Sequence, residues 1–534
     1  MIKKSILCFF VLIQLLSGYS QSLLVNSDQW LKAIRTNDEN KLISLIVKQP
    51  NAIDGFSDGK KTINFLNYSI EKGNERAVGI LLDHGANPNA KGHDTYPLIT
   101  AVRRMQYASV KALLLAGADA NVTDDNGNTP LTISTRSGSL RMTKMLVEAG
   151  ASLLRPDKKG RFFSDKVSRF DAPQLSTYLE NMENRQRKMK NMPNWSDGPY
   201  VISDSSKVVA FSMRSDCSLG TGTKTYHKIE GDYLIINGKR DQYLGNDYAT
   251  IPNSVTLKSF EKTVVVGDVH GQFQVLTHLL KKADVIDDSL SWKFGTNCLV
   301  FVGDILDRGE QVTECLWLIH RLGIEAKKVG GRVIYLMGNH EELVLLGDNG
   351  YVNDKYCALL NYFGLKVADV FATETFFGDW LRKLPVAVVI GKTLITHAGI
   401  SREMDQMNMS IGQIDSTLYS FFNSPPHQPN PLESLILMDE GPLWTRQYFP
   451  ELSSKEPLDS NHIRGILKKL NVETMIIGHT EVPTINTMFD NLVIGVNVPF
   501  NSSLNSGELL LIENDSKFYK IKFNGDKELF YIRN

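Results

Sequence analysis

The sequence has little cysteine and no excess of charge of either sign. Five cysteines in 534 residues are too few for a disulfide scaffold. Lysine plus arginine and aspartate plus glutamate each number 59, so the net charge is +0 and predicts no bulk attraction to nucleic acid or anionic lipid. With 42% hydrophobic and 22% charged residues, the composition excludes a wholly disordered or fibrous chain. The length predicts about three or four domains.

Long apolar stretches are also missing, apart from one at the N-terminus. Two lysines precede an almost entirely apolar run at residues 6–16, and small residues follow it. The run falls short of the roughly 20 residues that span a bilayer, which favours a signal peptide over a transmembrane anchor. We therefore expect a signal peptide over residues 1–20 and an exported protein, periplasmic or secreted, without stable membrane insertion.

Removal of that segment would leave four cysteines. Cys298 and Cys315 lie in apolar strand-like and helix-like runs, which predicts that both are buried small hydrophobic residues. An oxidising compartment permits a disulfide, but the sequence does not indicate one.

A Gly-Ala turn recurs at a fixed period near the N-terminus. Its glycines, Gly85, Gly117 and Gly150, are 32 and 33 residues apart. This period resembles that of ankyrin repeats, each of which is a turn followed by two short helices. Because one repeat cannot bury its apolar face alone, stacked neighbours must supply the core. We expect an α-helical ankyrin-repeat solenoid of about four repeats plus a cap over residues 27–184. Its surface would bind another protein, or the repeats would serve only as a spacer.

The composition changes after the repeats. Residues 185–199 combine a short basic run with Pro, Ser, Asp and Gly, which predicts a linker that begins with a solvated helix end. Residues 200–258 mix short β-like runs with Gly and Asn turns and should lead into the next domain.

From residue 262 onward, apolar β-rich runs alternate with helical stretches. Five of these runs end in polar residues, at 263–268, 298–304, 333–339, 393–399 and 475–480. The alternation predicts an α/β domain with a largely buried sheet, and chemistry gathers at the carboxyl ends of strands in such sheets. After Asn497, two further β-like runs predict a closing antiparallel hairpin.

Apart from the guanidinium of Arg308, the polar residues at these strand ends form one set of oxygen and imidazole donors without a thiolate. They are Asp268, His270, Asp304, Asp307, Arg308, Asn339, His340, Glu341, His397 and His479. Such donors suit Mn, Fe or Zn in a catalytic site better than structural zinc or copper. His278 and His320, which lie outside the motifs, are predicted to be core residues.

The motifs GDVHG, GDILDRG and GNHE, followed by two strand-end histidines, resemble those of the metallophosphoesterase superfamily and, within it, the phosphoprotein phosphatases. The approach to the second motif (292–304), LLGDNGYV (345–352) and GPLWTR (441–446) are similar to the Shewanella-like branch. His397 stands in HAG where the family has HGG, and the spacer between the first two motifs is longer than in the eukaryotic serine/threonine enzymes. The resemblance implies a β-sandwich core flanked by helices within residues 200–534.

The resemblance also implies a role for each site residue. Asp268 and His270 would bind one divalent metal ion, Asp304 would bridge two, and Asn339, His397 and His479 would bind the other. Four residues would act on the phosphoester: Arg308 and Arg446 would grip phosphate oxygens, His340 would be the general acid, and Asp307 would orient it.

The expected function is hydrolysis of a phosphate monoester on a protein by an exported phosphatase with an ankyrin arm. A first alternative is hydrolysis of small phosphoesters, including symmetrical dinucleotides. A second is an interaction protein whose repeats matter and whose phosphatase domain is not catalytic. The sequence leaves open the metal identity, the phosphoserine or phosphotyrosine preference and the partner of the repeats.

Overall fold

The computed structural model describes residues 27–57, 62–92, 95–154, 163, 172–190, 193–203, 208–216, 221–230, 233–236, 239–244, 255–424, 429–453, 455–501, 503 and 505–533. The expected signal peptide, residues 1–20, and Cys217 lie outside the described residues. The chain divides into two compact units. The first comprises residues 1–196 and 212–226, and the second comprises residues 197–211 and 227–534.

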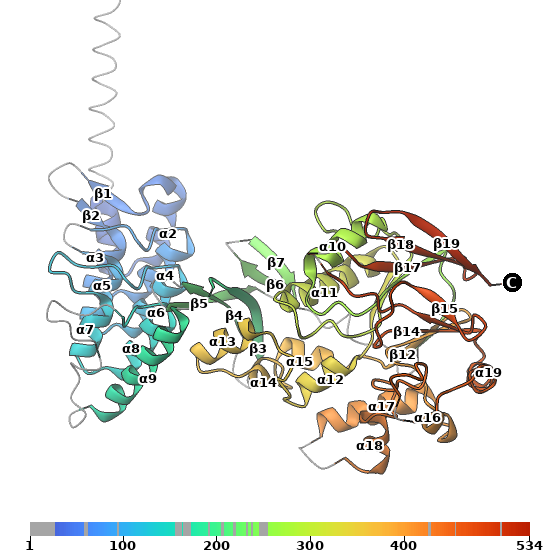
Figure 1. Ribbon diagram of the computed structural model, residues 1–534. Helices are drawn as coiled ribbons and strands as arrows, with labels where there is room; N and C mark the ends of the chain where they lie inside the picture. The colour runs from blue at the N-terminus through green and yellow to red at the C-terminus, as the bar shows by residue number, and fades with distance from the viewer. Residues whose placement is uncertain are drawn as a thin grey trace, which may run out of the picture. The chain divides into compact units, whose positions relative to one another are not determined.

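The first unit is built from short helices that follow one another in pairs (Figure 1). Residues 27–36 are helical, and a two-stranded antiparallel ribbon of β1 (Gly55–Ser57) and β2 (Thr62–Asn64) precedes the first full pair. The helices are α2 (Glu39–Lys48), α3 (Phe65–Glu71), α4 (Glu75–Asp83), α5 (Pro97–Arg103), α6 (Tyr107–Leu115), α7 (Pro130–Arg136), α8 (Leu140–Glu148) and α9 (Pro173–Met189), with a 3₁₀ turn at Pro50–Ala52.

The repeat predicted from the glycine spacing is present in this unit. Gly85, Gly117 and Gly150 follow α4, α6 and α8 with φ of 93°, 87° and 89°, a conformation that favours glycine. Asparagine side chains join successive turns at the same period: Asn89 donates to the carbonyl of Gly117, and Asn121 donates to that of Gly150, both at 2.9 Å. The same type of contact therefore links each turn to the next.

Helix α9 extends into the stretch predicted to be a linker. Residues 185–189 are its last residues, and Gln186 is buried. The Gln186 side chain donates to the carbonyl of Ala151 at 2.9 Å and accepts from the amide of Leu153 at 2.7 Å. These bonds give hydrogen-bond partners to the Ala151 carbonyl and the Leu153 amide, which follow the last repeat. They help to explain why a basic, polar sequence is ordered as a helix here.

Five strands between residues 196 and 243 form a sheet in the order β3-β4-β5-β6-β7. The strands are β3 (Ser196–Ser203), β4 (Val208–Asp216), β5 (Thr221–Glu230), β6 (Tyr233–Ile236) and β7 (Lys239–Tyr243). The predicted β-rich character of this segment is confirmed. Residues 212–226, in the middle of it, belong to the first unit rather than to the second.

The second unit contains two six-stranded sheets. One has the order β11-β10-β9-β17-β18-β19 and the other β15-β16-β14-β13-β12-β8. The first set is β9 (Lys262–Val266), β10 (Cys298–Phe301), β11 (Arg332–Tyr335), β17 (Glu508–Glu513), β18 (Lys517–Lys522) and β19 (Lys527–Ile532). The second set is β8 (Val255–Leu257), β12 (Ala387–Ile390), β13 (Thr393–Thr396), β14 (Thr474–Ile477), β15 (Asn486–Met488) and β16 (Val493–Gly495).

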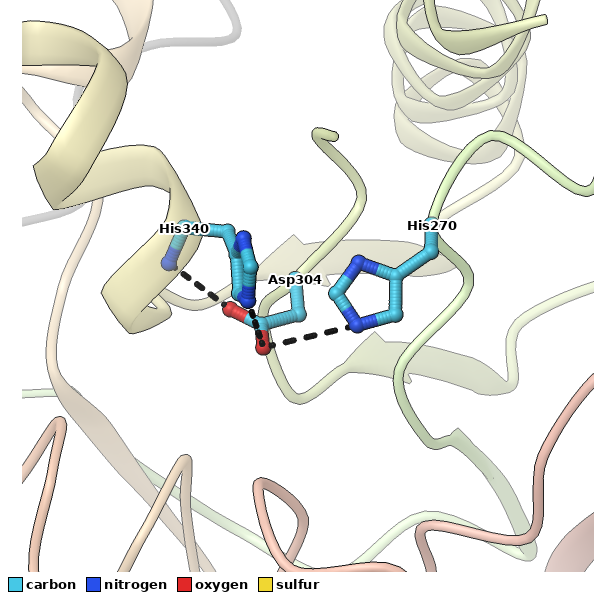
Figure 2. Close-up of side chains that lie close together, drawn as sticks. All are labelled: His270, Asp304 and His340. Carbon is cyan, nitrogen blue, oxygen red and sulfur yellow. Dashed lines mark hydrogen bonds and ion pairs between the residues drawn. The ribbon is translucent and has the colours of Figure 1, made fainter. Parts of the chain in front are cut away.

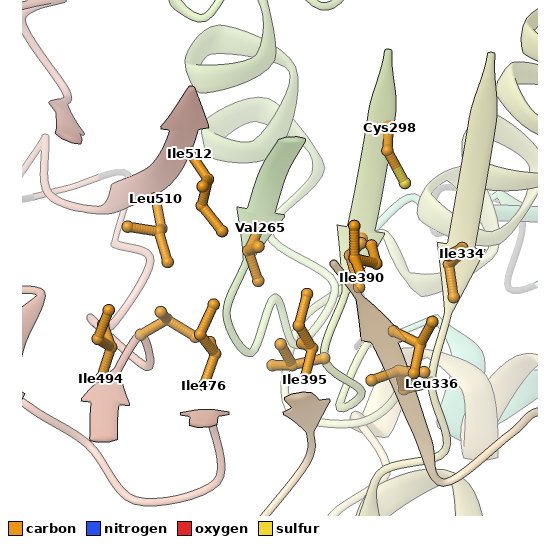
Figure 3. Close-up of a cluster of buried hydrophobic side chains, with 14 of the residues drawn as sticks. Val265, Cys298, Ile334, Leu336, Ile390, Ile395, Ile476, Ile494, Leu510 and Ile512 are labelled. Carbon is orange, nitrogen blue, oxygen red and sulfur yellow. The ribbon is translucent and has the colours of Figure 1, made fainter. Parts of the chain in front are cut away.

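The two sheets face each other across one hydrophobic core (Figure 3). Val265, Val300 and Leu510 come from the first sheet, and Ile395 and Ile476 come from the second, all fully or almost fully buried. Strands β10 and β14 are four residues long and buried throughout, which is why the sequence is largely apolar there. The predicted α/β domain is confirmed, and the predicted closing hairpin is the antiparallel pair β17 and β18.

Helices cover the sheets and connect the strands. They are α10 (Phe273–Lys282), α11 (Val312–Lys328), α12 (Asn339–Leu345), α13 (Asp354–Tyr362), α14 (Val367–Val370), α15 (Phe376–Leu381), α16 (Arg402–Gln406), α17 (Ile411–Asn423), α18 (Pro431–Leu437) and α19 (Ser460–Lys469). Within the described residues, none of the helices combines the length and the apolar character that a bilayer crossing requires.

The residues predicted to be structural are packed inside this unit. Cys298 and Cys315 are fully buried, with free thiols. His320 is buried against the rings of Trp317, Phe376 and Trp380. His278 is half-buried, stacks on Phe523 and donates to its carbonyl at 2.7 Å. The prediction of a core residue is confirmed for His320, whereas His278 is only half-buried.

Candidate metallophosphoesterase site

The carboxyl ends of five strands bring the predicted site residues together. Strands β9, β10 and β11 run parallel in one sheet, and β13 and β14 run parallel in the other. Parallel neighbours end at the same edge, so the loops after them converge. The residues carried on these loops are Asp268 and His270 after β9, Asp304 after β10, Asn339 and His340 at the start of α12, His397 after β13 and His479 after β14.

Asp304 lies at the centre of the site, buried between imidazoles (Figure 2). Its Oδ2 is 3.8 Å from His270 Nε2 and 3.9 Å from His340 Nε2. Its Oδ1 accepts the backbone N–H of His340 at 3.0 Å. His270, Asp304 and His340 can each offer a ligand atom within 4.8 Å of the others.

A second group meets Asp304 from the other sheet. His397 Nε2 is 3.4 Å from Asp304 Oδ1, and Asp304, His397 and His479 can again offer ligand atoms within 4.8 Å of one another. The side-chain oxygen of Asn339 lies 2.9 Å from His397 Nε2 and 2.9 Å from His479 Nδ1. Asp304 is therefore common to both groups, the position that the resemblance assigns to a bridging ligand.

Several site residues have a left-handed backbone conformation that non-glycine residues seldom adopt. The φ angles are 47° for His270, 51° for Asp304 and 57° for His479. Such a residue at a strand end turns the chain sharply, and the conformation costs of order 1–3 kcal/mol unless the surroundings impose it. Here the amides of Val269 and His270 both bond the Asp304 carbonyl, at 3.0 and 2.9 Å, so the first two loops fix each other.

Two glycines make room for the central carboxylate. Gly303 has φ of 115°, and a Cβ there would lie 2.7 Å from Gly338 Cα and 2.8 Å from His397 Nδ1. A Cβ on Gly338 would lie 2.3 Å from Asp304 Oδ1. Because real side chains do not approach so closely, both motif positions require glycine for the loops to pack.

Asp268 is buried next to these groups but belongs to neither of them. Its Oδ1 accepts the His479 backbone N–H at 3.2 Å, and its Oδ2 accepts from Asn497 Nδ2 at 2.5 Å. Burial and the charge of Asp304 raise the pKa of Asp268 well above its usual value. Asn497, which carries no motif signal, was not predicted to belong to the site.

Glu341 organises the loop that carries Asp304. Its two carboxylate oxygens accept the backbone N–H groups of Asp304, Ile305 and Leu306 at 2.7, 2.9 and 3.1 Å. Tyr335 also donates to it at 2.7 Å. The sequence places Glu341 in the GNHE motif but assigns it no role. Its hydrogen bonds indicate that it positions Asp304 by holding the turn.

His340 and Asp307 form a pair that suits proton transfer. His340 Nδ1 bonds Asp307 Oδ2 at 2.7 Å, and both side chains are almost fully buried. Burial opposes the charged imidazole, yet the Asp307 hydrogen bond and the charge of Asp304 raise the pKa of His340. The bond to Nδ1 leaves Nε2 as the atom that can hold a transferable proton.

The pKa values of the other three site histidines are shifted in the opposite direction. Burial lowers the pKa of His270 to about 4, lowers that of His397, and places that of His479 well below its usual value. Neutral imidazole is the form that binds a metal. His479 Nε2 is buried and has no hydrogen-bond partner among the described residues. The donor set and this unsatisfied nitrogen fit divalent cations.

Two arginines face the site from different loops. Arg308 follows Asp307, is about half exposed, and lies 3.7 Å from Glu481 Oε1. Arg446 is half-buried, and its Nη1 lies 3.4 Å from the hydroxyl of Thr480, next to His479. The positive charge of Arg446 contributes to the low pKa of both His397 and His479, as expected for a guanidinium close to these two imidazoles.

Comparison with known families agrees with this geometry. Residues 261–483 match the calcineurin-like phosphoesterase family, and residues 98–162 match ankyrin repeats in three copies. The chain is also 30% identical to a solved cold-active protein tyrosine phosphatase, with a TM-score of 0.56, over 63% of this chain and 98% of that chain. A structure of the cold-active protein-tyrosine phosphatase of a psychrophilic Shewanella species gives a TM-score of 0.54 at 30% identity, over 63% of this chain and 99% of that one.

Sequence relatives give the same assignment. The chain is similar to Shewanella-like protein phosphatase 1 of Plasmodium berghei, 26% identical over 229 residues, which are 42% of this chain and 62% of the relative. It thus spans less than two thirds of that relative. It is also similar to a symmetrical bis(5′-nucleosyl)-tetraphosphatase of Actinobacillus succinogenes, 33% identical over 156 residues, 27% of this chain and 46% of the relative. The chain belongs to the calcineurin-like phosphoesterase family of hydrolases and carries ankyrin repeats.

Proposed function

We propose that the protein is a metal-dependent phosphatase that hydrolyses phosphate monoesters, with phosphorylated proteins as substrates. The observation that carries the proposal is the position of Asp304, which lies between two imidazole-containing groups and belongs to both. A shared carboxylate of this kind suits a pair of divalent cations, with manganese, iron or zinc matching the oxygen and imidazole donors.

Each predicted ligand has a place in this proposal. His270 and Asp304 would hold one cation, with Asp268 beside them, and Asp304, Asn339, His397 and His479 would hold the other. The chemistry that such cations supply is Lewis-acid stabilisation of a phosphoryl oxygen and activation of water. The neutral imidazoles and the unsatisfied His479 Nε2 support this ligand set.

The chain's own residues would handle the ester and the proton. Arg308 and Arg446 would bind phosphate oxygens, because a guanidinium presents paired donors to such a group. Water attacks phosphorus and the bond to the leaving oxygen breaks. His340 Nε2 gives its proton to that oxygen, while Asp307 holds Nδ1 and stabilises the charged ring.

His340 also has a competing interpretation as a ligand. Its Nε2 lies 3.9 Å from Asp304 Oδ2, within the first group of possible metal ligands. The hydrogen bond between His340 Nδ1 and Asp307 Oδ2, at 2.7 Å, orients the ring as a proton donor and raises the pKa of His340, which favours the protonated form that binds no cation. We therefore assign His340 to the acid role.

Protein substrates are supported by the relatives named as protein phosphatases and by the ankyrin repeats. We propose that the helix pairs stack as a solenoid whose surface binds a protein partner. The similarity to a symmetrical dinucleotide hydrolase keeps small phosphoesters as a second candidate substrate class.

The decisive experiment uses the purified full chain. Metal content would be measured together with turnover of phosphoserine and phosphotyrosine peptides, a symmetrical dinucleoside tetraphosphate and p-nitrophenyl phosphate. Bound metal with turnover of phosphopeptides supports the proposal, and preference for the dinucleotide supports the second candidate. Bound metal without any turnover would instead favour an interaction protein with a non-catalytic phosphatase domain.

We also propose export, on the basis of the apolar run at residues 6–16 after two lysines. The expected mature N-terminus is Gln21 in a periplasmic or secreted protein. N-terminal sequencing of the protein recovered from its native host would test this. An intact residue 1 in a cytoplasmic fraction would contradict it.

A further inference from the structure

A buried carboxylate lies outside the metal groups, on strand β3. The side chain of Asp197 is fully buried, and Lys355, which is also buried, places its Nζ 3.7 Å from Asp197 Oδ1. Thr313 donates its hydroxyl to the same oxygen at 2.7 Å, and Tyr200 donates to Oδ2. Buried charges need such partners, so this cluster is a built feature of the second unit.

The cluster holds the backbone that leads into helix α11. Lys355 Nζ donates to the carbonyl of Glu310 at 2.5 Å, and the hydroxyl of Tyr356 donates to the same carbonyl at 2.9 Å. The Tyr356 hydroxyl also accepts the backbone N–H of Val312 at 2.7 Å. Thr313, in the first turn of the helix, adds the bond to Asp197. Residues 310–313 are therefore fixed by buried side chains.

These residues directly follow the turn that carries two proposed site residues. Asp307 and Arg308 have φ of 68° and 60°, two successive left-handed conformations in non-glycine residues. The turn is also tied to the chain before α13, because Arg308 N–H donates to the Tyr351 carbonyl and Asn353 Nδ2 donates to the Arg308 carbonyl, both at 2.9 Å. A strained turn persists only where its surroundings impose it.

We propose that Asp197 is a positioning residue for the Asp307–Arg308 turn, acting through Thr313 and Lys355; this rests on the proposed phosphatase function. Strand β3 precedes residues 261–483, which match the family model, so the active site would depend on a segment outside that match. Trp317 strengthens that dependence, because its indole donates to the Pro199 carbonyl at 3.0 Å and anchors β3 on α11.

The sharpest variant is Thr313→Val in the full chain. It removes one hydroxyl, keeps the volume and leaves the Asp197–Lys355 pair intact. We expect kcat on a phosphoserine peptide to fall about tenfold, with a smaller loss on p-nitrophenyl phosphate, whose leaving group needs little protonation. Thr313→Ser keeps the donor and should restore both rates. Asp197→Asn should show the same pattern with a larger loss.

A second measurement does not depend on turnover. Hydrogen exchange of the amides in residues 305–316 should be at least about tenfold faster in Thr313→Val and Asp197→Asn than in the wild type. The matched control is Asp515→Asn, which breaks another largely buried ion pair of the second unit, that of Asp515 with Arg533. Asp515→Asn should lower the melting temperature. It should change neither the hydrogen exchange of residues 305–316 nor the ratio of the rates on the phosphoserine peptide and on p-nitrophenyl phosphate.

The outcomes separate this inference from the proposed function. A wild type with bound metal but no phosphatase activity refutes the proposed function, and the exchange measurement then decides whether Asp197 holds the turn. The inference is overturned, even when the enzyme is active, if Thr313→Val exchanges the amides of residues 305–316 as the wild type does and keeps the wild-type ratio of rates on the two substrates. Equal losses in Thr313→Ser and Thr313→Val also overturn it, because the hydroxyl would then have no role.

Discussion

At the scale of single residues, the surroundings of the site histidines favour different protonation states. His270, His397 and His479 are buried in surroundings that favour the neutral ring, whereas the Asp307 hydrogen bond favours the charged ring of His340. The same residue type could thus serve the two kinds of chemistry proposed for this site, metal binding and proton transfer. Histidine is suited to this because its ordinary pKa lies close to neutrality.

Asp304→Asn should remove activity and metal together. The amide keeps the shape of the carboxylate but loses the charge that both imidazole groups share, so affinity for metal should fall at least about 100-fold. Metal content and turnover of p-nitrophenyl phosphate would be measured on the same sample. Asp379→Asn, at the half-buried ion pair with Lys383, is the matched control and should behave as the wild type. Two retained metals with near-normal turnover would refute the bridging role.

His340→Asn should separate chemistry from metal binding. We expect both metals to remain and the rate on a phosphoserine peptide to fall by about 10²–10⁴-fold, the usual range for loss of a general acid. The loss on p-nitrophenyl phosphate should be smaller, because p-nitrophenolate leaves without much protonation. His278→Asn changes a packing histidine and is the control. Loss of metal, or equal losses on both substrates, would assign His340 to a ligand or folding role.

At the scale of elements, a half-buried carboxylate links helix α17 to the start of a strand. Asp415 accepts the backbone N–H of Val386 at 2.8 Å, immediately before β12. Burial raises the pKa of Asp415 to about 6, against roughly 3.9 in an unfolded chain. The folded state therefore binds this proton more tightly than the unfolded state. The resulting stabilisation is complete below about pH 4 and is lost as the pH rises through about 6.

Asp415→Asn should cancel this dependence. The amide keeps an oxygen for the Val386 N–H and cannot ionise, so its melting temperature relative to the wild type should rise between about pH 5 and about pH 7.5. Thermal unfolding at the two pH values measures the difference. Asp439→Asn, an exposed carboxylate, is the control and should show no such trend. A constant offset between Asp415→Asn and the wild type would mean that Asp415 ionises as freely as an exposed residue.

The strands and the motif residues could be predicted from the sequence because their signals are local. Runs such as 298–304 are apolar up to the motif residues that end them, and each of the five predicted runs overlaps an observed strand. Contacts between distant segments gave no such signal. Asn497 meets Asp268 across 229 positions, and Asp197 meets Thr313 across 116. For residues 185–189 the basic run predicts a solvated helix end, and helix α9 does end there, but it buries Gln186 and Met189, which the local charge pattern does not indicate.

At the scale of the whole molecule, the predicted site residues all lie at or beyond Asp268, far from the repeats in sequence. Deletion of residues 21–190 should therefore leave metal content and turnover of p-nitrophenyl phosphate largely intact. Residues 212–226 belong to the first unit, and a Cβ on Gly150 would lie 2.5 Å from Thr223 Oγ1. The shortened chain should accordingly be less soluble, because this part of β4 and β5 loses its packing partners.

Turnover of small and large substrates by the shortened chain would be compared with that of the full chain. A selective loss on phosphoproteins would indicate that the repeats bind the substrate. A folded deletion variant with both metals but without activity on the small ester would contradict the prediction that the site works without the repeats. It would mean that the repeats complete the site.

The order of strands has a consequence for when the enzyme matures. Strand β9, which leads to Asp268, pairs with β10 on one side and with β17 (Glu508–Glu513) on the other. The chain emerges from the ribosome N-terminus first, so this flank stays open until residues 508–513 have been made. His479 and Asn497 also come late. On the proposed ligand set, the site would be complete only after residue 479 has been made, so a ribosome that stalls before it would leave a product with ankyrin repeats but without one proposed ligand.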